Sequence, residues 1–176
     1  MPLPRAPQRI TVGFAFSFVD RAIQEGLANR RFGQPEIAAV IEYFGTDPPQ
    51  CAYCGDEDVR RWDHLVAVKW CGDTVLGNMV PACSRCDDSK RDMPYEEWML
   101  SGARHSPKSR GVPDVEQRVA RLRAYAEKYQ YSPRSREERL VAADVEELMR
   151  LRHKLGGMRK EIEQFLLRQS EHRQTP

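Results

Sequence analysis

The first apolar pattern of the chain lies between Ile10 and Phe18, where apolar residues alternate with small or polar ones. A period of two residues is typical of a β-strand. A competing interpretation starts a helix near Ser17, because Asp20 follows three residues later in a capping-box arrangement. We predict a helix from about Val19 to Arg30.

A second helix is indicated by the residues that follow. Pro35 stands where a first helical residue is expected, and Gly45 stands where the helix should end. Between them, apolar residues repeat at the spacing of one helix face: Ile37, Val40, Ile41 and Phe44. Residues 1–50 are therefore predicted to form an N-terminal helical segment.

The patterns after residue 50 predict a small mixed core followed by a helical region, so the expected fold class is α+β. We assign the core to residues 51–100, a linker rich in Gly, Pro, Ser and basic residues to 101–113, and C-terminal helices to 114–176. The expected elements are strands at Val59–His64 and Met79–Pro81, and helices at Ser84–Arg91, Asp114–Tyr131 and from Ser132 to about Gln169.

The last predicted helix carries a heptad pattern. Apolar residues recur every seven positions in two series three residues apart: Val141, Leu148, Leu155 and Ile162, and then Leu151, Met158 and Phe165. This is an a/d seam, with Asp144 as a polar break and Gly156-Gly157 as weak helix formers. The seam must bury against its twin or against upstream helices of the same chain. We favour a homodimer through residues 140–166.

Composition narrows the class of protein. The chain has 176 residues, 31% of them charged, and a net charge of only +2. One compact domain with an appendage is expected, and any binding of nucleic acid must rest on a local patch. No stretch approaches the roughly 20 apolar residues of a membrane span, and residues 10–19 lack a cleavage site typical of a secretory leader. We therefore expect a cytoplasmic protein that does not enter a membrane.

A local basic patch does exist between Arg104 and Arg136, where positive residues outnumber negative ones. Arg118 and Arg121 flank the apolar stripe of the predicted helix 114–131. Such residues would bind the phosphates of a DNA backbone without reading its sequence. A merely solvated helix face is an equally good interpretation.

Four of the five cysteines form two Cys-x-x-Cys pairs: Cys51 and Cys54, and Cys83 and Cys86. Two such turns present four sulfurs to one ion, and a tetrahedral sulfur site favours Zn²⁺. Because all four ligands belong to protein, the predicted zinc is structural. The alternative is a set of reduced core cysteines. Cys71 has no partner in this pattern and receives no role.

The stretch between and beyond these pairs carries candidate chemistry. Asp63 and His64 end a predicted strand, and Asp87 and Asp88 follow the last cysteine at a predicted helix start. Carboxylates suit Mg²⁺, and a neutral histidine can act as a general base. A carboxylate-bound cation beside such a base would hydrolyse phosphodiesters. The alternative from spacing alone is a structural zinc ribbon with ordinary surface acids.

The order of these residues resembles the HNH endonucleases, the ββα-metal family. The resemblance rests on C-x-x-C, then D-H, then N-x-V-P-A-C-x-x-C, then an acid and x-x-K, and it covers about Cys51 to Trp98. It implies a ββα core that is stapled by the four-cysteine zinc site and flanked by helices. It also implies hydrolysis of nucleic acid with 5′-phosphate ends.

The resemblance assigns roles to five residues. His64 would be the general base, Asp63 would bind one Mg²⁺ or Mn²⁺, and Asn78 would hold the loop that orients His64. Asp87 stands at the last motif position, usually His or Asn, and would be a second oxygen ligand for the cation. Lys90 would contact a phosphate as a point charge.

The function expected from the sequence is therefore a metal-dependent DNA endonuclease of a restriction, phage or mobile-element system. Two alternatives stay open: a non-catalytic zinc-ribbon module that binds nucleic acid, and an HNH nuclease that acts on RNA or modified DNA. Since one HNH site cuts one strand, a twofold pair of sites would make a double-strand break.

Overall fold

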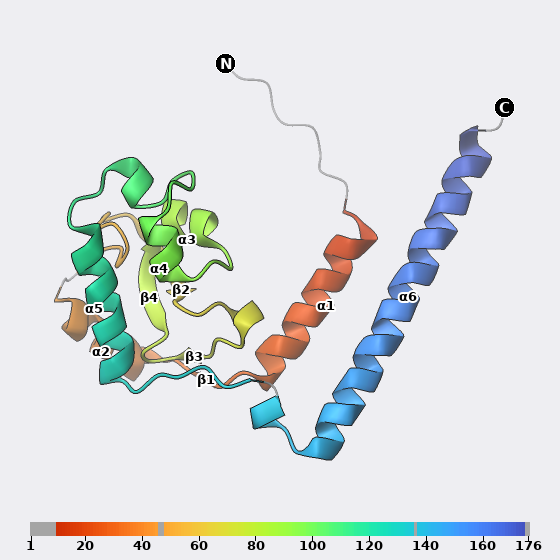
Figure 1. Cartoon of the computed structure of the whole chain (residues 1–176), viewed down its shortest axis with the longest axis horizontal. Coiled ribbons are helices and arrows are strands. Elements are labelled where there is room, and N and C mark those ends of the chain that lie inside the picture. Colours follow the sequence, from red (N-terminus) through yellow and green to blue (C-terminus); the bar gives the residue numbers. More distant parts are fainter. Residues whose placement is uncertain (1–9, 46–47, 136, 175–176) are drawn as a thin grey trace. The chain divides into compact units, whose positions relative to one another are not determined.

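The computed structural model describes residues 10–45, 48–135 and 137–174 (Figure 1). Arg136 of the basic patch lies outside this part of the chain. The chain divides into two compact units, one made of Gln24–Ser135 and the other of residues 1–23 together with 136–176. The four cysteines and the candidate catalytic residues all belong to the unit Gln24–Ser135.

Helix α1 spans Val12–Leu27 and corrects the first prediction. It begins near Thr11, whose hydroxyl accepts a hydrogen bond from the backbone N–H of Phe14 at 3.2 Å, an N-cap contact. The alternation that suggested a strand is instead helical: Phe14 and Phe18, four residues apart, pack their rings edge to face at 4.9 Å. The predicted start near Val19 was therefore wrong.

Helix α2 spans Gln34–Phe44 and confirms the second prediction. The Glu36 carboxylate accepts a hydrogen bond from Gly33 N–H at 2.8 Å at the start of the helix. At its end Gly45 adopts φ 64°, and its N–H donates to the Ile41 carbonyl. A left-handed residue at this position favours glycine.

The predicted hairpin is present as strands β2 (Val59–His64) and β4 (Met79–Cys83), which pair antiparallel. His64 lies opposite Met79 and Asp63 opposite Val80. The connection between them contains a 3₁₀ turn at Val68–Trp70 and strand β3 (Thr74–Val75). Strand β3 pairs in parallel with β1 (Arg30–Arg31), which the sequence pattern did not predict.

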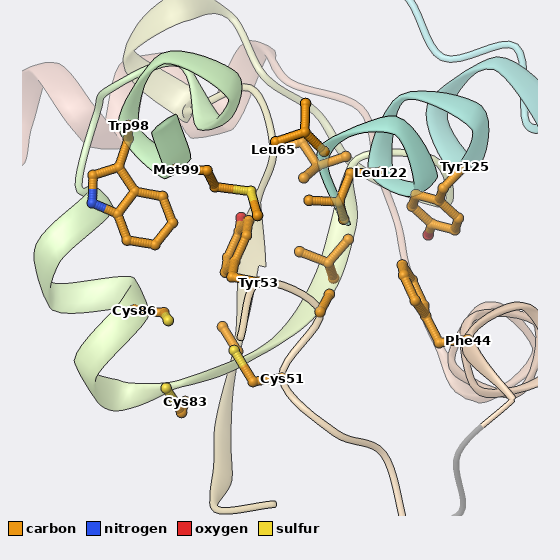
Figure 2. Packing of buried hydrophobic residues seen from close by; sticks show 14 of the residues in the cluster. Phe44, Cys51, Tyr53, Leu65, Cys83, Cys86, Trp98, Met99, Leu122 and Tyr125 are labelled. Atoms are coloured by element: carbon orange, nitrogen blue, oxygen red, sulfur yellow. The ribbon is translucent and has the colours of Figure 1, made fainter. Parts of the chain in front are cut away.

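Helices cover the hairpin. Helix α3 (Ser84–Lys90) follows β4 directly, as predicted, and α4 (Tyr95–Leu100) was not foreseen. Helix α5 (Val115–Lys128) carries the predicted apolar stripe, whose last position the sequence left open between Tyr125 and Ala126, and it buries Val115, Val119, Leu122 and Tyr125. Figure 2 shows Tyr125 and Phe44 at one side of this core, Trp98 at the other and Tyr53 between them. The α+β architecture expected from the sequence is thus confirmed.

The segment predicted as a linker, residues 101–113, packs against the core. Ser106 is fully buried, and its hydroxyl donates to the Ser101 carbonyl at 2.7 Å. A 3₁₀ turn, Lys108–Arg110, follows. This segment carries a contact to the cysteine cluster that is described below.

The second unit contains part of α1, a 3₁₀ turn at Glu137–Arg139 and helix α6 (Ala142–Gln174). Arg152 of α6 forms an ion pair with Asp20 of α1. None of the described side chains of α6 is buried. Among the residues that the structure describes, no helix is long and apolar enough to cross a membrane.

Candidate functional site

The four paired cysteines come together in space from three elements. Cys51 and Cys54 lie in the turn before β2, Cys83 ends β4, and Cys86 lies in α3. Their sulfurs all lie within 4.8 Å of one another, and none forms a disulfide. Figure 2 shows three of the side chains gathered at one edge of the core.

The spacing of these sulfurs fits zinc. The Sγ atoms of Cys54 and Cys83 are 3.8 Å apart, and a tetrahedron of sulfurs with Zn–S bonds of about 2.3 Å has edges of about 3.8 Å. Hydrogen bonding with Cys51 and then with Cys54 raises the pKa of the Cys86 thiol well above its usual range. A cation bound among the four sulfurs would hold all of them as thiolates. The cluster is therefore consistent with a structural zinc site.

Two arginines lie beside this cluster. Arg110, from the segment 101–113, donates from Nη2 to the Cys86 sulfur at 3.0 Å. The guanidinium of Arg118 packs against Gly55, where a Cβ would meet its Nη2 at 2.9 Å. Since a Zn²⁺ with four thiolates carries a net charge of −2, these cations would compensate it. Arg118, a candidate DNA contact, is thus held next to the cysteine turn.

Asp63 is buried, with 8% of its surface exposed. Its Oδ2 accepts a hydrogen bond from the Tyr53 hydroxyl at 2.7 Å and lies 3.2 Å from Lys90 Nζ. Its Oδ1 accepts from the His64 backbone N–H at 2.7 Å. Burial raises the pKa of Asp63, while the Lys90 charge and the Tyr53 hydroxyl oppose this shift.

His64 is the last residue of β2, and its side chain contacts the loop that follows. His64 Nε2 lies 3.0 Å from the hydroxyl oxygen of Thr74 in β3. A threonine hydroxyl can accept from Nε2–H, and this contact fixes the ring orientation. The structure thus gives the imidazole a defined position beside Asp63.

Asn78 is fully buried and holds the two ends of the same loop together. Its Oδ1 accepts from Val66 N–H at 2.8 Å, and its Nδ2 donates to the carbonyls of Val66 and Asp73 at 3.1 and 2.7 Å. The side chain therefore uses three hydrogen bonds to close the loop that starts directly after His64. This placement supports the orienting role expected of Asn78.

Asp87 lies in the first turn of α3 and is partly exposed. Its Oδ2 accepts from Arg61 Nη1 at 2.7 Å, and the same nitrogen donates to Asp88 Oδ1 at 2.5 Å. Among the His, Cys, Asp and Glu residues that the structure describes, one group of three or more could hold a metal ion. It is the four cysteines, whose sulfurs all lie within 4.8 Å of one another. His64, Asp63 and Asp87 do not form so tight a group. Two carboxylates completed by water and phosphate are nevertheless a common Mg²⁺ arrangement.

Two residues expected to contact nucleic acid, Lys90 and Arg121, form hydrogen bonds within the protein instead. Lys90 is fully buried, and its Nζ donates to the His64 carbonyl at 2.6 Å, so the expected contact with a phosphate does not fit its position. Arg121 Nη2 donates to the carbonyls of Tyr43 and Phe44 at 3.2 and 2.7 Å, at the C-terminal end of α2. Its guanidinium is therefore engaged within the unit.

Three site residues were missed from the sequence: Tyr53, Arg61 and Thr74. Arg61 had a signal, because it lies two positions before Asp63 and a strand places such residues on one face. Tyr53 lies between the first two cysteines, so the Cys-x-x-Cys turn could have drawn attention to it. Thr74 had no signal, since only tertiary pairing brings it to His64.

These features define a ββα domain in which a hairpin and helix carry a cluster of four cysteines at one end and a His-Asp pair at the other. The family model described as HNH endonuclease matches residues 51–92, so the chain contains an HNH endonuclease domain. HNH enzymes usually use a divalent metal. Searches of curated proteins and of solved structures found no match.

Proposed function

We propose that this protein is a metal-dependent endonuclease that hydrolyses DNA phosphodiester bonds. The observation that carries the proposal is the position of His64 at the end of β2, next to Asp63 and in contact with Lys90 of α3, within the segment matched by the HNH family. An HNH domain implies a nucleic-acid substrate. The choice of DNA and the roles of individual residues are our proposal.

In this proposal His64 removes a proton from the attacking water. The contact of His64 Nε2 with Thr74 Oγ1 at 3.0 Å orients the ring, and a neutral imidazole carries one nitrogen lone pair that can take the proton. Asn78 keeps the loop closed and so holds Thr74 in place. Lys90 neutralises Asp63 from within the core and positions the His64 backbone.

Asp63 and Asp87 are the residues that would hold Mg²⁺ or Mn²⁺. When bound, the cation supplies positive charge at the scissile phosphate and the leaving oxygen. For Asp87 to serve as a ligand, its ion pair with Arg61 must open, and the released guanidinium is then close to the site. The zinc held by the four cysteines stays structural in this scheme, since no coordination position is left open.

A non-catalytic zinc-ribbon module is favoured by one observation. Both candidate metal-binding carboxylates already face cations, Asp63 with Lys90 and Asp87 with Arg61. In such a module the ion pairs would be permanent, and neither His64 nor Asp63 would matter for binding.

Incubation with supercoiled plasmid separates the two functions. Purified protein is given Mg²⁺, Mn²⁺ or chelator, and the products are resolved as nicked or linear DNA. Cleavage that needs the added cation and is lost in His64→Ala supports the nuclease. Binding without any nicking would refute it. Parallel reactions with RNA and with cytosine-modified DNA test the substrate alternatives.

We also propose a homodimer through residues 140–166. The d positions of the seam, Leu151, Met158 and Phe165, are 43%, 53% and 51% exposed. The a position Leu155 is partly buried and lines a pocket with Phe16 of α1. The upstream helix therefore covers part of the seam and leaves its d residues for a second copy. Two sites would then serve the double-strand cleavage expected of a restriction, phage or mobile-element nuclease.

A further inference from the structure

Strand β1 brings two arginines to the edge of the candidate site from far away in the sequence. Arg30 and Arg31 pair in parallel with Thr74 and Val75, more than forty residues later (Figure 1). Thr74 is the residue whose hydroxyl contacts His64. The short β1–β3 ladder therefore connects an exposed basic dipeptide to the imidazole that the proposed reaction uses.

The register of the β1–β3 pairing puts the side chains of Arg30 and Arg31 on opposite faces of this ladder. Directly paired residues of neighbouring strands project to the same face of a sheet, and successive residues project to opposite faces. Arg30 is paired with Thr74, so it shares the face from which Thr74 reaches His64. Arg31 is paired with Val75 and projects to the other face.

The backbone that carries Arg30 is firmly fixed. The N–H of the preceding residue, Asn29, donates to Asp73 Oδ1 at 2.6 Å, and the Asn29 carbonyl accepts from Thr74 N–H at 2.9 Å. Directly after β1 in the chain, the ring of Phe32 packs edge to face on the ring of Trp62, with 5.0 Å between the ring centroids. Arg30 is therefore presented from an anchored strand, which lowers the entropy lost when it binds.

The charge of Arg30 is accessible to a ligand. Its side chain is 60% exposed, and its Nη1 lies 3.3 Å from Glu25 Oε2, longer than a strong charge-assisted hydrogen bond. By contrast, Lys90 is buried against Asp63, and Arg121 is bonded to carbonyls of α2. A guanidinium that is held so loosely can exchange its carboxylate for a phosphate.

From this arrangement we propose that Arg30 binds a backbone phosphate of the nucleic-acid substrate, adjacent to the one cleaved at His64. This inference rests on the proposed nuclease function and adds a substrate-positioning residue to it. The contact carries no sequence information. Arg30 therefore affects binding of substrate far more than the chemical step.

The test compares Arg30→Ala with Arg31→Ala, which removes the same charge from the opposite face. Binding to a fluorescent DNA duplex is measured by anisotropy in the His64→Ala background over a series of salt concentrations, and cleavage kinetics are measured in the wild-type background. We expect Arg30→Ala to raise Kd and KM about tenfold with kcat changed less than about threefold. Loss of one phosphate contact should also reduce the salt slope by about 0.9. Arg31→Ala should change Kd less than about threefold.

Equal effects of the two variants would overturn the assignment, because they would reflect bulk charge alone. Zinc content and thermal unfolding show whether each variant is folded, and Arg30→Gln replaces Arg30→Ala if that variant is not. If wild-type protein binds duplex but never cleaves it, the nuclease proposal fails while the Arg30 contact is still decided by binding. If it cleaves and the two variants behave alike, only the Arg30 inference fails.

Discussion

The carboxylate of Asp63 is held by hydrogen bonds and an ion pair from three different parts of the chain, and these contacts affect its pKa. Tyr53 comes from the cysteine turn, Lys90 from α3 and the His64 N–H from the next residue of the strand. Burial also raises the pKa of the Tyr53 phenol, so this side chain stays a proton donor to Asp63. A buried carboxylate without such partners would be neutral. The Lys90 charge and the Tyr53 hydroxyl oppose the rise that burial causes in the pKa of Asp63 and so favour the charged form, which can bind a cation.

Replacing His64 tests the proposed base. His64→Ala should lower the cleavage rate by about 10²- to 10⁴-fold, the usual contribution of a general base. Zinc content and the unfolding midpoint should stay near wild type, because His64 is not part of the four-sulfur cluster. Cleavage is measured as plasmid nicking, and zinc by metal analysis. A variant that loses zinc or fails to fold would contradict this division of roles.

Replacing Lys90 tests the buried pair. In Lys90→Met the opposing charge is gone, so the already raised pKa of Asp63 rises further. A carboxyl with a raised pKa binds protons more tightly in the folded state, so its cost to stability is greatest at high pH and is relieved as pH falls. We expect a loss of about 3–5 kcal/mol at about pH 8.5 and a clearly smaller loss at about pH 6, measured by urea unfolding.

The matched control for this prediction is Lys69→Met. Lys69 has the same charge but is 57% exposed, so its loss should cost little and show no such dependence on pH. In cleavage assays, the acid limb of the Lys90→Met profile should move to higher pH. An equal stability deficit at both pH values would mean that Lys90 acts by packing and not by its charge.

At the scale of elements, the hairpin and α3 depend on the cysteine cluster for their arrangement. The cluster joins the turn before β2, the end of β4 and the start of α3. The Cys51–Cys54 turn also bonds to β4 directly, through Ala52 N–H and the Pro81 carbonyl at 2.9 Å. Metal binding at such a site is part of the folding free energy.

Cys83→Ser should therefore remove zinc and abolish cooperative unfolding of the unit Gln24–Ser135. The binding free energy at stake, about 10–16 kcal/mol for structural zinc, exceeds the stability of a typical domain. Circular dichroism and metal analysis measure the outcome. Cys71→Ser is the control, since Cys71 lies outside the cluster, and it should keep both zinc and fold. An active, stable Cys83→Ser protein would refute the structural-zinc interpretation.

The elements also show where sequence patterns are informative. Strand β2, helix α2 and the buried stripe of α5 were predicted, because each carries a local period and clear end signals. The early part of α1 was not, since alternating Phe residues satisfied the period of a strand while Thr11 supplied the helix cap. Strand β1 was invisible, because two exposed arginines have no apolar period.

At the scale of the whole molecule, α1 and α6 form a unit with little core of its own. None of the residues of α1 is buried, and α6 exposes a series of large apolar side chains: Met149, Leu151, Met158, Ile162, Phe165, Leu166 and Leu167. Two helices that bury so little need a further partner to be stable. A second copy of the same seam would provide it.

A double variant, Leu151→Glu with Met158→Glu, should turn a wild-type dimer into a monomer, since four glutamates would face each other in the dimer seam. Met149→Glu with Leu167→Glu is the control, because it adds the same charge and removes two residues that are 63% and 62% exposed and lie off the seam. Sedimentation analysis at micromolar concentration measures the mass. A monomeric wild type, or equal effects of both pairs, would exclude this dimer.

The amino-acid sequence by itself determined the cysteine pairs, the His-Asp end of the hairpin and the helix that follows, because these rest on spacing within short segments. Only the tertiary structure decided that Lys90 lies inside the core, that Tyr53 bonds to Asp63 and that Arg30 pairs with Thr74. These contacts join residues that are far apart in the chain, and no periodic sequence pattern links them. They arise only when burial selects one packing of the elements.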